Sequence, residues 1–495
     1  MDVALAGGPL GATALEEFLG VTLDALAAGA KERGGPIPAG DPRELGARWR
    51  AELGDLLPET GSEPETVLAQ LVGQLAAGAA DPADPACAAH LHCPPLAVAV
   101  AADTAVAAVN PSLDSWDQAP LASVLETELV LALARLVGFG PGAGGVITAG
   151  GTESNLMGLL LARDHVLAER YGVQAARAGV PAAAAGRLRI LCSAVAHFSI
   201  ARSAGFLGLG EDAVVPVAVD HAHRMIPAAL AEELAGIRAR HEVPVAIVAT
   251  AGTTDLGGID PIREVAAIAR KHRAWFHVDA AYGGGALFSA RLAHLLDGLD
   301  LADSVGLDLH KFGWQPVAAG AFLTRQRTAF APLDRTVAYL NSTDDENAGY
   351  TSRLGSSLRT TRRADAVKIA VTLRSLGKAG LGELVDRCHD LAVHAAEIIR
   401  AQPRLELRAD PVLSTVVFRY LPAEDGDVCA VNARLRRALL ASGLGVIGRT
   451  TMTDPSGREA VYLKLTMLNP TTTPRDVDAL LNRILAHGEA AEVSP

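Results

Sequence analysis

The chain has 495 residues, of which 49% are hydrophobic and 20% are charged, a balance typical of soluble enzymes. Its length exceeds what one hydrophobic core usually serves, so we expect two or three domains. The formal net charge of −12 disfavours nucleic acid and anionic membranes as partners.

Cysteine usage and the start of the chain predict a cytoplasmic protein. The five cysteines are scattered and odd in number, which argues against a disulfide framework. The first residues lack a basic stretch followed by an apolar core, so we expect no secretory signal. The longest apolar run, residues 96–109, is too short to span a bilayer and contains Asp103.

Residues 1–95 are expected to form an N-terminal helical segment that ends in a cluster of possible metal ligands. These are Cys87, His90, His92 and Cys93. Four ligands packed into seven residues can hardly surround a zinc ion, and neither usual zinc spacing is present, so we predict no metal site. A turn that places His90 or His92 near a ligand fits the pattern better.

A glycine turn follows, after an amphipathic helix expected at residues 121–137. A short strand stops at Gly150 and Gly151, and Thr152 opens a helix that continues to about Arg170. Glycines let an anion approach the backbone closely, and the helix start offers free N–H groups and positive potential. The spacing matches neither the dinucleotide fingerprint nor a Walker loop. The turn is therefore either a phosphate cradle or a helix start that simply required glycine.

Strands and helices alternate through the middle of the chain, which predicts a mainly parallel sheet with helices on both faces. The expected strands are 189–193, 214–219, 244–250, 274–279, 303–308 and 320–324, with helices near 225–240 and 260–272. Ligands collect at the carboxyl ends of such strands. At those ends the sequence places His197, Thr254, Asp279 and Lys311.

Lys311 follows His310 at the end of an apolar run that begins at Ala302. Burial favours the neutral amine of a lysine, which is the form that makes a Schiff base. A lysine that reaches the surface is the ordinary alternative. Asp279, at the end of a second strand, favours the interpretation that Lys311 forms a Schiff base. A phosphate cradle, a flat histidine, an acid and an imine-forming lysine are together what pyridoxal phosphate needs.

The rhythm changes in the last part of the chain. Residues 339–361 are polar and have no clear period, which makes them a candidate mobile loop. Beyond about residue 380, the expected helices are 381–401, 428–442 and 474–487, and the expected strands lie near 404–408, 413–420 and 461–467. We therefore predict an N-terminal segment 1–95, a large domain 96–378 and a small α+β domain 379–495.

With these motifs the chain resembles the group II pyridoxal-phosphate decarboxylases, which include glutamate, aromatic amino acid and 2,4-diaminobutyrate decarboxylases. The resemblance runs from about residue 85 to residue 480, and its motifs lie at 110–120, 148–155, 197, 249–261, 277–284, 303–311 and 362–368. It implies an α/β protein of PLP fold type I (aspartate aminotransferase-like). Its large domain would hold a mainly parallel seven-stranded sheet, beside a small C-terminal α+β domain. The resemblance also implies a homodimer with active sites at the subunit interface.

The resemblance further implies roles toward pyridoxal 5'-phosphate. Lys311 would form the Schiff base, Asp279 would pair with the pyridine nitrogen and His197 would stack on the ring. The further cofactor-binding residues would be Gly151, Thr152, Thr254, Ala281 and His310. Aromatic-type members have asparagine two residues before the motif histidine, where this chain has Asp308.

A proton donor is also implied. Members of this family protonate the carbanion left by CO2 with a tyrosine on a mobile loop, often across the dimer. Tyr350 is the tyrosine within the 341–361 loop, and Tyr339 is its competitor. If neither tyrosine can reach, oxygen-dependent formation of an aldehyde becomes the alternative reaction.

Several stretches resemble the bacterial diaminobutyrate and lysine branch more than the aromatic or glutamate branches. They are residues 89–92, 110–118, 310–316 and 463–470. We therefore expect decarboxylation of a basic or small polar L-amino acid, such as 2,4-diaminobutyrate or lysine. An aromatic-amino-acid decarboxylase or a decarboxylating aldehyde synthase is the second hypothesis. A catalytically silent scaffold and another reaction on the same cofactor, such as transamination, stay open.

Overall fold

The computed structural model describes residues 4–337, 339–423, 426–454 and 456–493. These residues form two compact units. One unit contains the described residues up to Pro94 together with those from Cys388 onward, and the other is Pro95–Arg387. The N-terminal helices thus belong to the same unit as the C-terminal elements, and the three-part division expected from the sequence stays a prediction.

The larger unit is built on a seven-stranded sheet with the order β2-β8-β7-β6-β5-β3-β4. Its strands are β2 (Gly144–Thr148), β3 (Leu188–Ser193), β4 (Val214–Val217), β5 (Val243–Thr250), β6 (Trp275–Ala280), β7 (Ser304–Asp308) and β8 (Gly320–Thr324). The neighbouring pairs from β4 to β7 are parallel, whereas β8 runs antiparallel to both β7 and β2. The expected α/β class and mainly parallel seven-stranded sheet are confirmed.

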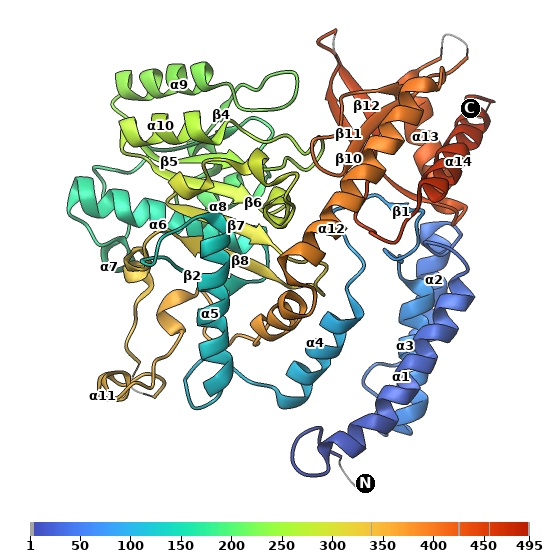
Figure 1. Cartoon of the computed structure of the whole chain (residues 1–495), viewed down its shortest axis with the longest axis horizontal. Helices are drawn as coiled ribbons and strands as arrows, with labels where there is room; N and C mark the ends of the chain where they lie inside the picture. Colours follow the sequence, from blue (N-terminus) through green and yellow to red (C-terminus); the bar gives the residue numbers. More distant parts are fainter. Residues whose placement is uncertain (1–3, 338, 424–425, 455, 494–495) are drawn as a thin grey trace. The chain divides into compact units, whose positions relative to one another are not determined.

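Helices cover both faces of this sheet (Figure 1). A Cβ on Gly306 of β7 would meet Ser154 of α6, and a Cβ on Gly145 of β2 would meet Val130 of α5. Because Gly145 points away from the face that Val146 and Gly306 share, α5 and α6 lie on opposite faces. Because both faces are covered, the central strand β5 is buried along its whole length and reads as a continuous apolar run. The helices of this unit are α4 (Ala97–Val109), α5 (Pro120–Val137), α6 (Gly151–Tyr171), α7 (Ala175–Ala178), α8 (Ser199–Phe206), α9 (Pro227–Ala239), α10 (Ile262–His272) and α11 (Thr343–Asn347).

Short 3-10 helices complete the loops of the larger unit, and α12 (Ala366–Ala401) leads out of it. Gly377 interrupts α12 with φ 65° and ψ 175°, so α12 consists of two helices joined through one non-helical residue. The 3-10 helices are η1 (Glu211–Ala213), η2 (Gly283–Phe288), η3 (Ala293–Leu296), η4 (Leu299–Leu301), η5 (Arg327–Leu333) and η6 (Leu354–Ser356).

The smaller unit contains a five-stranded sheet with the order β1-β11-β12-β10-β9. Its strands are β1 (Cys87–Ala88), β9 (Leu405–Leu407), β10 (Thr415–Tyr420), β11 (Val446–Thr453) and β12 (Glu459–Thr466), and its helices are α1 (Gly11–Arg33), α2 (Pro42–Leu53), α3 (Pro64–Gly78), α13 (Val428–Ala441) and α14 (Pro474–Val493). The edge strand β1 pairs parallel with β11, so the N-terminal segment completes this sheet. No helix in the described parts of the chain is long and apolar enough to cross a membrane.

Candidate active site

The carboxyl ends of β6 and β7 bring two charged groups to one edge of the large sheet. Asp279 stands near the end of β6, and Lys311 follows Asp308, the last residue of β7. The two strands are parallel neighbours in which Asp279 lies opposite Gly306. Asp279 is buried, and the side chain of Lys311 is 19% exposed. The edge predicted to carry the chemistry therefore does carry both groups.

Two donors hold the Asp279 carboxylate. Asn155 of α6 donates an Nδ2–H to Asp279 Oδ2 at 2.8 Å, and the backbone N–H of Ala281 donates to Oδ1 at 3.1 Å. Asn155 is itself fixed, because its Oδ1 lies 2.9 Å from His277 Nε2. All these groups are buried, so the orientation of the carboxylate is set by the fold rather than by solvent.

A hydrogen-bond chain extends from Asp279 back to the start of β6. Trp275 Nε1–H donates to Ser304 Oγ at 2.9 Å, and Ser304 Oγ lies 2.9 Å from His277 Nδ1. Because Asn155 uses its amide N–H groups elsewhere, His277 Nε2 must carry the imidazole proton, and Nδ1 accepts the hydroxyl proton of Ser304. Burial lowers the pKa of His277, in agreement with this neutral form. We call Trp275, Ser304, His277, Asn155 and Asp279 the buried chain.

His197 joins the same network through Ser199. The Ser199 hydroxyl lies 2.9 Å from Asn155 Nδ2 and 2.8 Å from His197 Nδ1, and the backbone N–H of Ser199 also donates to Nδ1 at 3.3 Å. Because Nδ1 accepts, the neutral imidazole carries its proton on Nε2. Burial lowers the pKa of His197, and the charges of Asp279 and Lys311 also act on it. The structure thus brings three predicted site residues together.

Asp308 lies between Lys311 and His310. Its Oδ2 is 3.2 Å from Lys311 Nζ and 3.5 Å from His310 Nε2. Its Oδ1 is buried and has no hydrogen-bond partner among the described residues. The backbone N–H of Ala319 donates to His310 Nδ1 at 3.3 Å, and burial lowers the pKa of His310. A neutral His310 therefore presents its Nε2–H to Asp308.

The start of α6 forms the predicted glycine turn beside these groups. Gly150 has φ 154°, and a Cβ there would lie 2.9 Å from Cε1 of His310. A Cβ on Gly151 would lie 3.0 Å from Cβ of Ala281, so the backbone needs glycine to approach this closely. The first N–H groups of the helix, including that of Thr152, have no partner within the helix, and they make an anion cradle.

The remaining predicted positions are Thr254 and the two candidate tyrosines. Thr254 is exposed in the loop after β5. Tyr350 is 50% exposed and packs edge-on against Trp116 of its own chain, with ring centroids 5.2 Å apart, while Tyr339 is 84% exposed. Within the described part of the chain, neither tyrosine makes a hydrogen bond or ring contact with the residues around Lys311.

A buried ion-pair cluster anchors the segment that carries Tyr350. Glu126 of α5 is fully buried and pairs with Arg362 at 2.9 Å and with Arg353 at 3.4 Å. Arg353 also donates to the backbone carbonyl of Gly145 at 2.9 Å. Breaking such a buried pair typically costs about 3–5 kcal/mol, so the two ion pairs hold Arg353 and Arg362 firmly against α5.

Asn155, His277 and Ser199 are functional candidates that were not predicted as site residues. His277 could have been found, because residues two apart in a strand point to the same side and His277 precedes Asp279 by two. Asn155 gave no such indication, since its role depends on how α6 packs against β6. The prediction that no metal is bound concerned the segment from Cys87 to Cys93. In the residues that the structure describes, no group of three or more His, Cys, Asp or Glu could hold a metal ion.

Known proteins resemble this chain over most of its length. The model of the pyridoxal-dependent decarboxylase conserved domain matches residues 49–421. An L-2,4-diaminobutyrate decarboxylase of Rhizobium meliloti is 42% identical over 438 residues, which cover 88% of this chain and 84% of the relative. A protein of the same name from Acinetobacter baumannii is 38% identical, covering 81% and 79%.

A solved structure agrees with these sequence matches. It is the crystal structure of the glutamate decarboxylase domain of diaminobutyrate-pyruvate transaminase and L-2,4-diaminobutyrate decarboxylase from Vibrio parahaemolyticus. It superposes with a TM-score of 0.88 at 33% identity, and the match covers 98% of this chain and 97% of that one.

Proposed function

Because the chain belongs to the family of pyridoxal-dependent decarboxylases, we propose that its substrate is the small basic amino acid L-2,4-diaminobutyrate. The chain is a pyridoxal-phosphate-dependent carboxy-lyase that acts on an amino acid. The observation that carries the choice of substrate is the 42% identity, over 88% of the chain, with a relative of that name. The motifs shared with the diaminobutyrate branch support the same choice.

The residues at the edge of the sheet fit this cofactor. We propose that the Lys311 amine holds the aldehyde, that Asp279 faces the ring nitrogen and that His197 covers a face of the ring. The first N–H groups of α6, from Gly151 and Thr152, would bind the phosphate. The close approach of Gly151 to Ala281 and the two donors on Asp279 support this fit.

Bound pyridoxal phosphate supplies an electron-poor ring, which accepts the electron pair left when a carboxylate leaves as CO2. The chain provides orientation and proton transfer around it. Asp279, held by donors on both oxygens, presents a fixed negative charge that stabilises a protonated nitrogen facing it. Asp308 Oδ2, 3.2 Å from Lys311 Nζ, holds that amine in place. Since Asp308 already contacts Lys311 and His310, we assign it no phosphate contact.

We propose that Tyr350 returns the proton to carbon, and that it does so in the partner subunit of a homodimer. In its own subunit Tyr350 packs on Trp116 and makes no described contact near Lys311, while half of its surface is open. A tyrosine placed this way is available to a second copy. A cytoplasmic location stays a prediction from the sequence.

The test is CO2 release from a panel of L-amino acids, with pyridoxal phosphate added to the purified protein. The panel contains 2,4-diaminobutyrate, ornithine, lysine, glutamate and tryptophan. We expect the highest kcat/KM for 2,4-diaminobutyrate. A faster reaction with tryptophan would assign the chain to the aromatic branch, and no CO2 from any of them would support a silent scaffold.

A further inference from the structure

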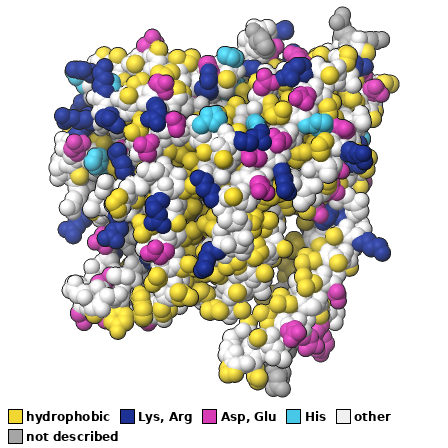
Figure 2. Space-filling model, viewed as in Figure 1, with side chains coloured by type: hydrophobic (Ala, Val, Ile, Leu, Met, Phe, Trp, Pro, Cys, Tyr) yellow, Lys and Arg dark blue, Asp and Glu magenta, His cyan; other side chains and the backbone are white. Residues whose placement is uncertain are grey.

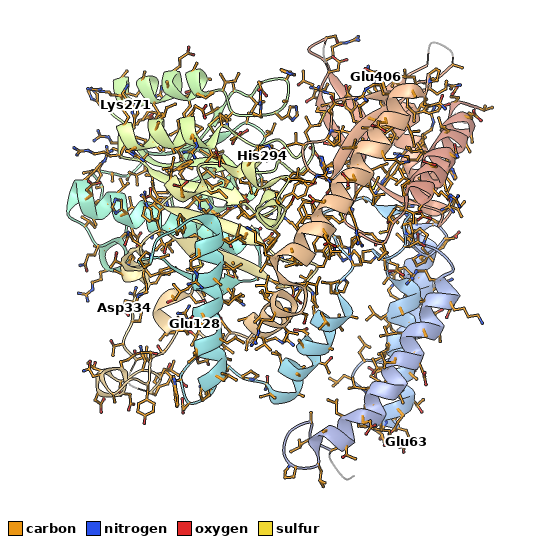
Figure 3. The ribbon with its side chains drawn as sticks, viewed as in Figure 1. Glu63, Glu128, Lys271, His294, Asp334 and Glu406 are labelled. Carbon is orange, nitrogen blue, oxygen red and sulfur yellow. The ribbon has the colours of Figure 1, made fainter. Side chains whose placement is uncertain are left out.

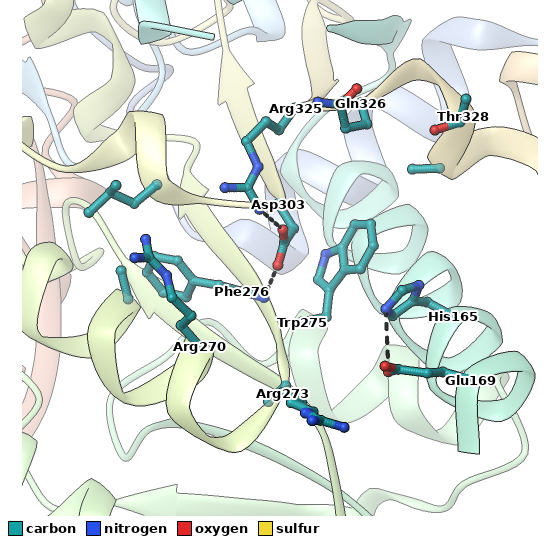
Figure 4. A pocket seen from close by; sticks show the side chains of 14 residues that line it. His165, Glu169, Arg270, Arg273, Trp275, Phe276, Asp303, Arg325, Gln326 and Thr328 are labelled. Carbon is teal, nitrogen blue, oxygen red and sulfur yellow. Dashed lines mark hydrogen bonds and ion pairs between the residues drawn. The ribbon is translucent and has the colours of Figure 1, made fainter. Parts of the chain in front are cut away.

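A cavity lies at the end of the strands opposite to Asp279 and Lys311. It has a volume of about 470 Å³ and forms where β6 and β7 begin and β8 ends (Figure 4). Small-molecule sites usually measure about 300–1,000 Å³. Trp275 in its wall precedes Asp279 by four residues, or about 13 Å of extended strand. The cavity is therefore separate from the candidate active site.

Cationic side chains reach this cavity from several elements. Arg270 and Arg273 come from the end of α10, and Arg325 follows β8 (Figure 4). Arg325 is paired with Asp303, whose other oxygen accepts a backbone N–H at 2.9 Å. Within the described residues, Arg270 and Arg273 make no ion pair and no side-chain hydrogen bond. Two guanidinium groups thus remain uncommitted at the cavity.

The acidic side chains of the lining do not cancel this charge. Asp303 pairs with Arg325, and Glu169 lies on the exposed surface of α6. The lining thus holds three arginines against two carboxylates. Beside the cavity, Arg170 of α6 donates to the carbonyl of His272 at 3.2 Å, which brings another cation to the end of α10. An anion at this place would therefore find mainly positive neighbours.

This concentration of cations is local. The whole chain carries a net charge of −12, yet Lys and Arg side chains gather over the region of α6 and α10, at the left of Figure 2. The negative end of the α10 dipole favours cations in its last turn, which accounts for part of the cluster. It does not account for Arg325, which follows β8.

Arg273 also occupies a backbone conformation that costs energy. It is the C-cap of α10, with φ 53° and ψ 40°, in the left-handed region that glycine adopts more easily. Strain of this kind at a residue lining a cavity is a recognised indication of function. A glycine would end the helix equally well, but it would remove the guanidinium.

We propose that this cavity binds a small organic anion with carboxylate or phosphate groups on a short flat or apolar body. Arg270 and Arg273 bind the anionic groups, and an apolar wall accepts the body. That wall is formed by Ala266, Ala274, Trp275, Leu301 and Ala329. Trp275 is also the first residue of the buried chain that ends at Asp279, so a ligand here touches a residue connected to the active site. The site does not depend on which amino acid is decarboxylated.

The experiment is isothermal titration calorimetry of the holoenzyme with citrate and, separately, with adenosine monophosphate. In the holoenzyme the phosphate cradle of the active site is already filled. Sodium chloride at matched ionic strength is the reference. We expect saturable binding of at least one probe. Citrate alone would assign a polycarboxylate, and the nucleotide alone would assign a phosphate ester. The double variant Arg270→Gln/Arg273→Gln should weaken this binding at least about tenfold, because two charge-assisted contacts are lost.

Lys271→Gln is the matched control. Lys271 sits in the same last turn of α10 and is exposed, but it does not line the cavity (Figure 3). This variant should change affinity less than twofold. A further variant, Arg273→Gly, should weaken binding by less than the double variant does and without a fall in Tm, because glycine suits the left-handed backbone. The absence of saturable binding of both probes, or equal weakening by Lys271→Gln and the double variant, would overturn the proposal.

Discussion

Asn155→Leu is the change that tests the buried chain most sharply. Leucine has nearly the shape of asparagine, but it cannot donate to Asp279 or accept from His277. The variant removes the 2.8 Å bond to the carboxylate, the 2.9 Å bond to His277 and the 2.9 Å contact with Ser199. It also leaves a buried imidazole N–H without an acceptor.

The expected magnitudes follow from these contacts. A hydrogen bond to a charged group contributes about 1.5–3 kcal/mol and a neutral one about 0.5–1.5 kcal/mol, so losing one charged and two neutral contacts should lower the free energy of unfolding by about 2.5–6 kcal/mol. Residues that orient a metal ligand typically change activity about 10- to 100-fold when mutated, and we expect a comparable loss of kcat for the residue that orients Asp279.

The assay pairs urea unfolding of the holoenzyme with CO2 release at saturating cofactor. Ser304→Ala is the control, because it breaks the two contacts at the far end of the chain and leaves Asn155 bound to Asp279. The control should lose stability and keep most of its kcat. An Asn155→Leu protein with kcat within twofold of wild type, or a Ser304→Ala protein with the same loss of kcat, would refute the reasoning.

Three further outcomes are expected. Asp279→Asn should bind cofactor yet lose kcat/KM at least about a hundredfold, the equivalent of two pKa units of lost stabilisation of the ring proton, measured by CO2 release; near-normal turnover would contradict its role. Tyr350→Phe should keep CO2 release but divert the product from amine to aldehyde. Tyr339→Phe should still yield the amine, and product analysis distinguishes the two variants. Because burial lowers the pKa of His277 below its usual 6.5, protonation favours the unfolded chain. The free energy of unfolding should therefore fall as pH drops below about 6.5, and His277→Gln should lessen that fall; an unchanged pH dependence would argue against a neutral His277.

Much of the large sheet could be predicted because its strands are buried on both faces and read as short apolar runs between helices. β1 and β11 were not predicted, and β11 shows the physical reason. It contains Gly448 and Arg449 and has alternating exposure in its second half, so its residues do not form an apolar run. A Cβ on Gly448 would lie 2.8 Å from the carbonyl oxygen of Ala89, and this packing of the N-terminal segment is invisible to local patterns.

The candidate site likewise contains residues that local patterns predict and contacts that only packing creates. Lys311 and Asp279 were predictable because Asp279 lies near the end of one apolar strand and Lys311 just after another, and parallel strands end at a common edge. The contact between Asn155 and Asp279 joins residues 124 positions apart, and only the packing of α6 on the sheet creates it. The position of Tyr350 on Trp116 was equally beyond the sequence, since nothing in the polar loop specifies its partner.

Reduction of the holoenzyme with borohydride, followed by peptide mapping in a mass spectrometer, tests the central claim most directly. We expect a pyridoxyl group on Lys311. No other lysine should carry this label, and neither should the peptide that contains Asp279. A label on a different lysine, with Lys311 unmodified, would contradict it.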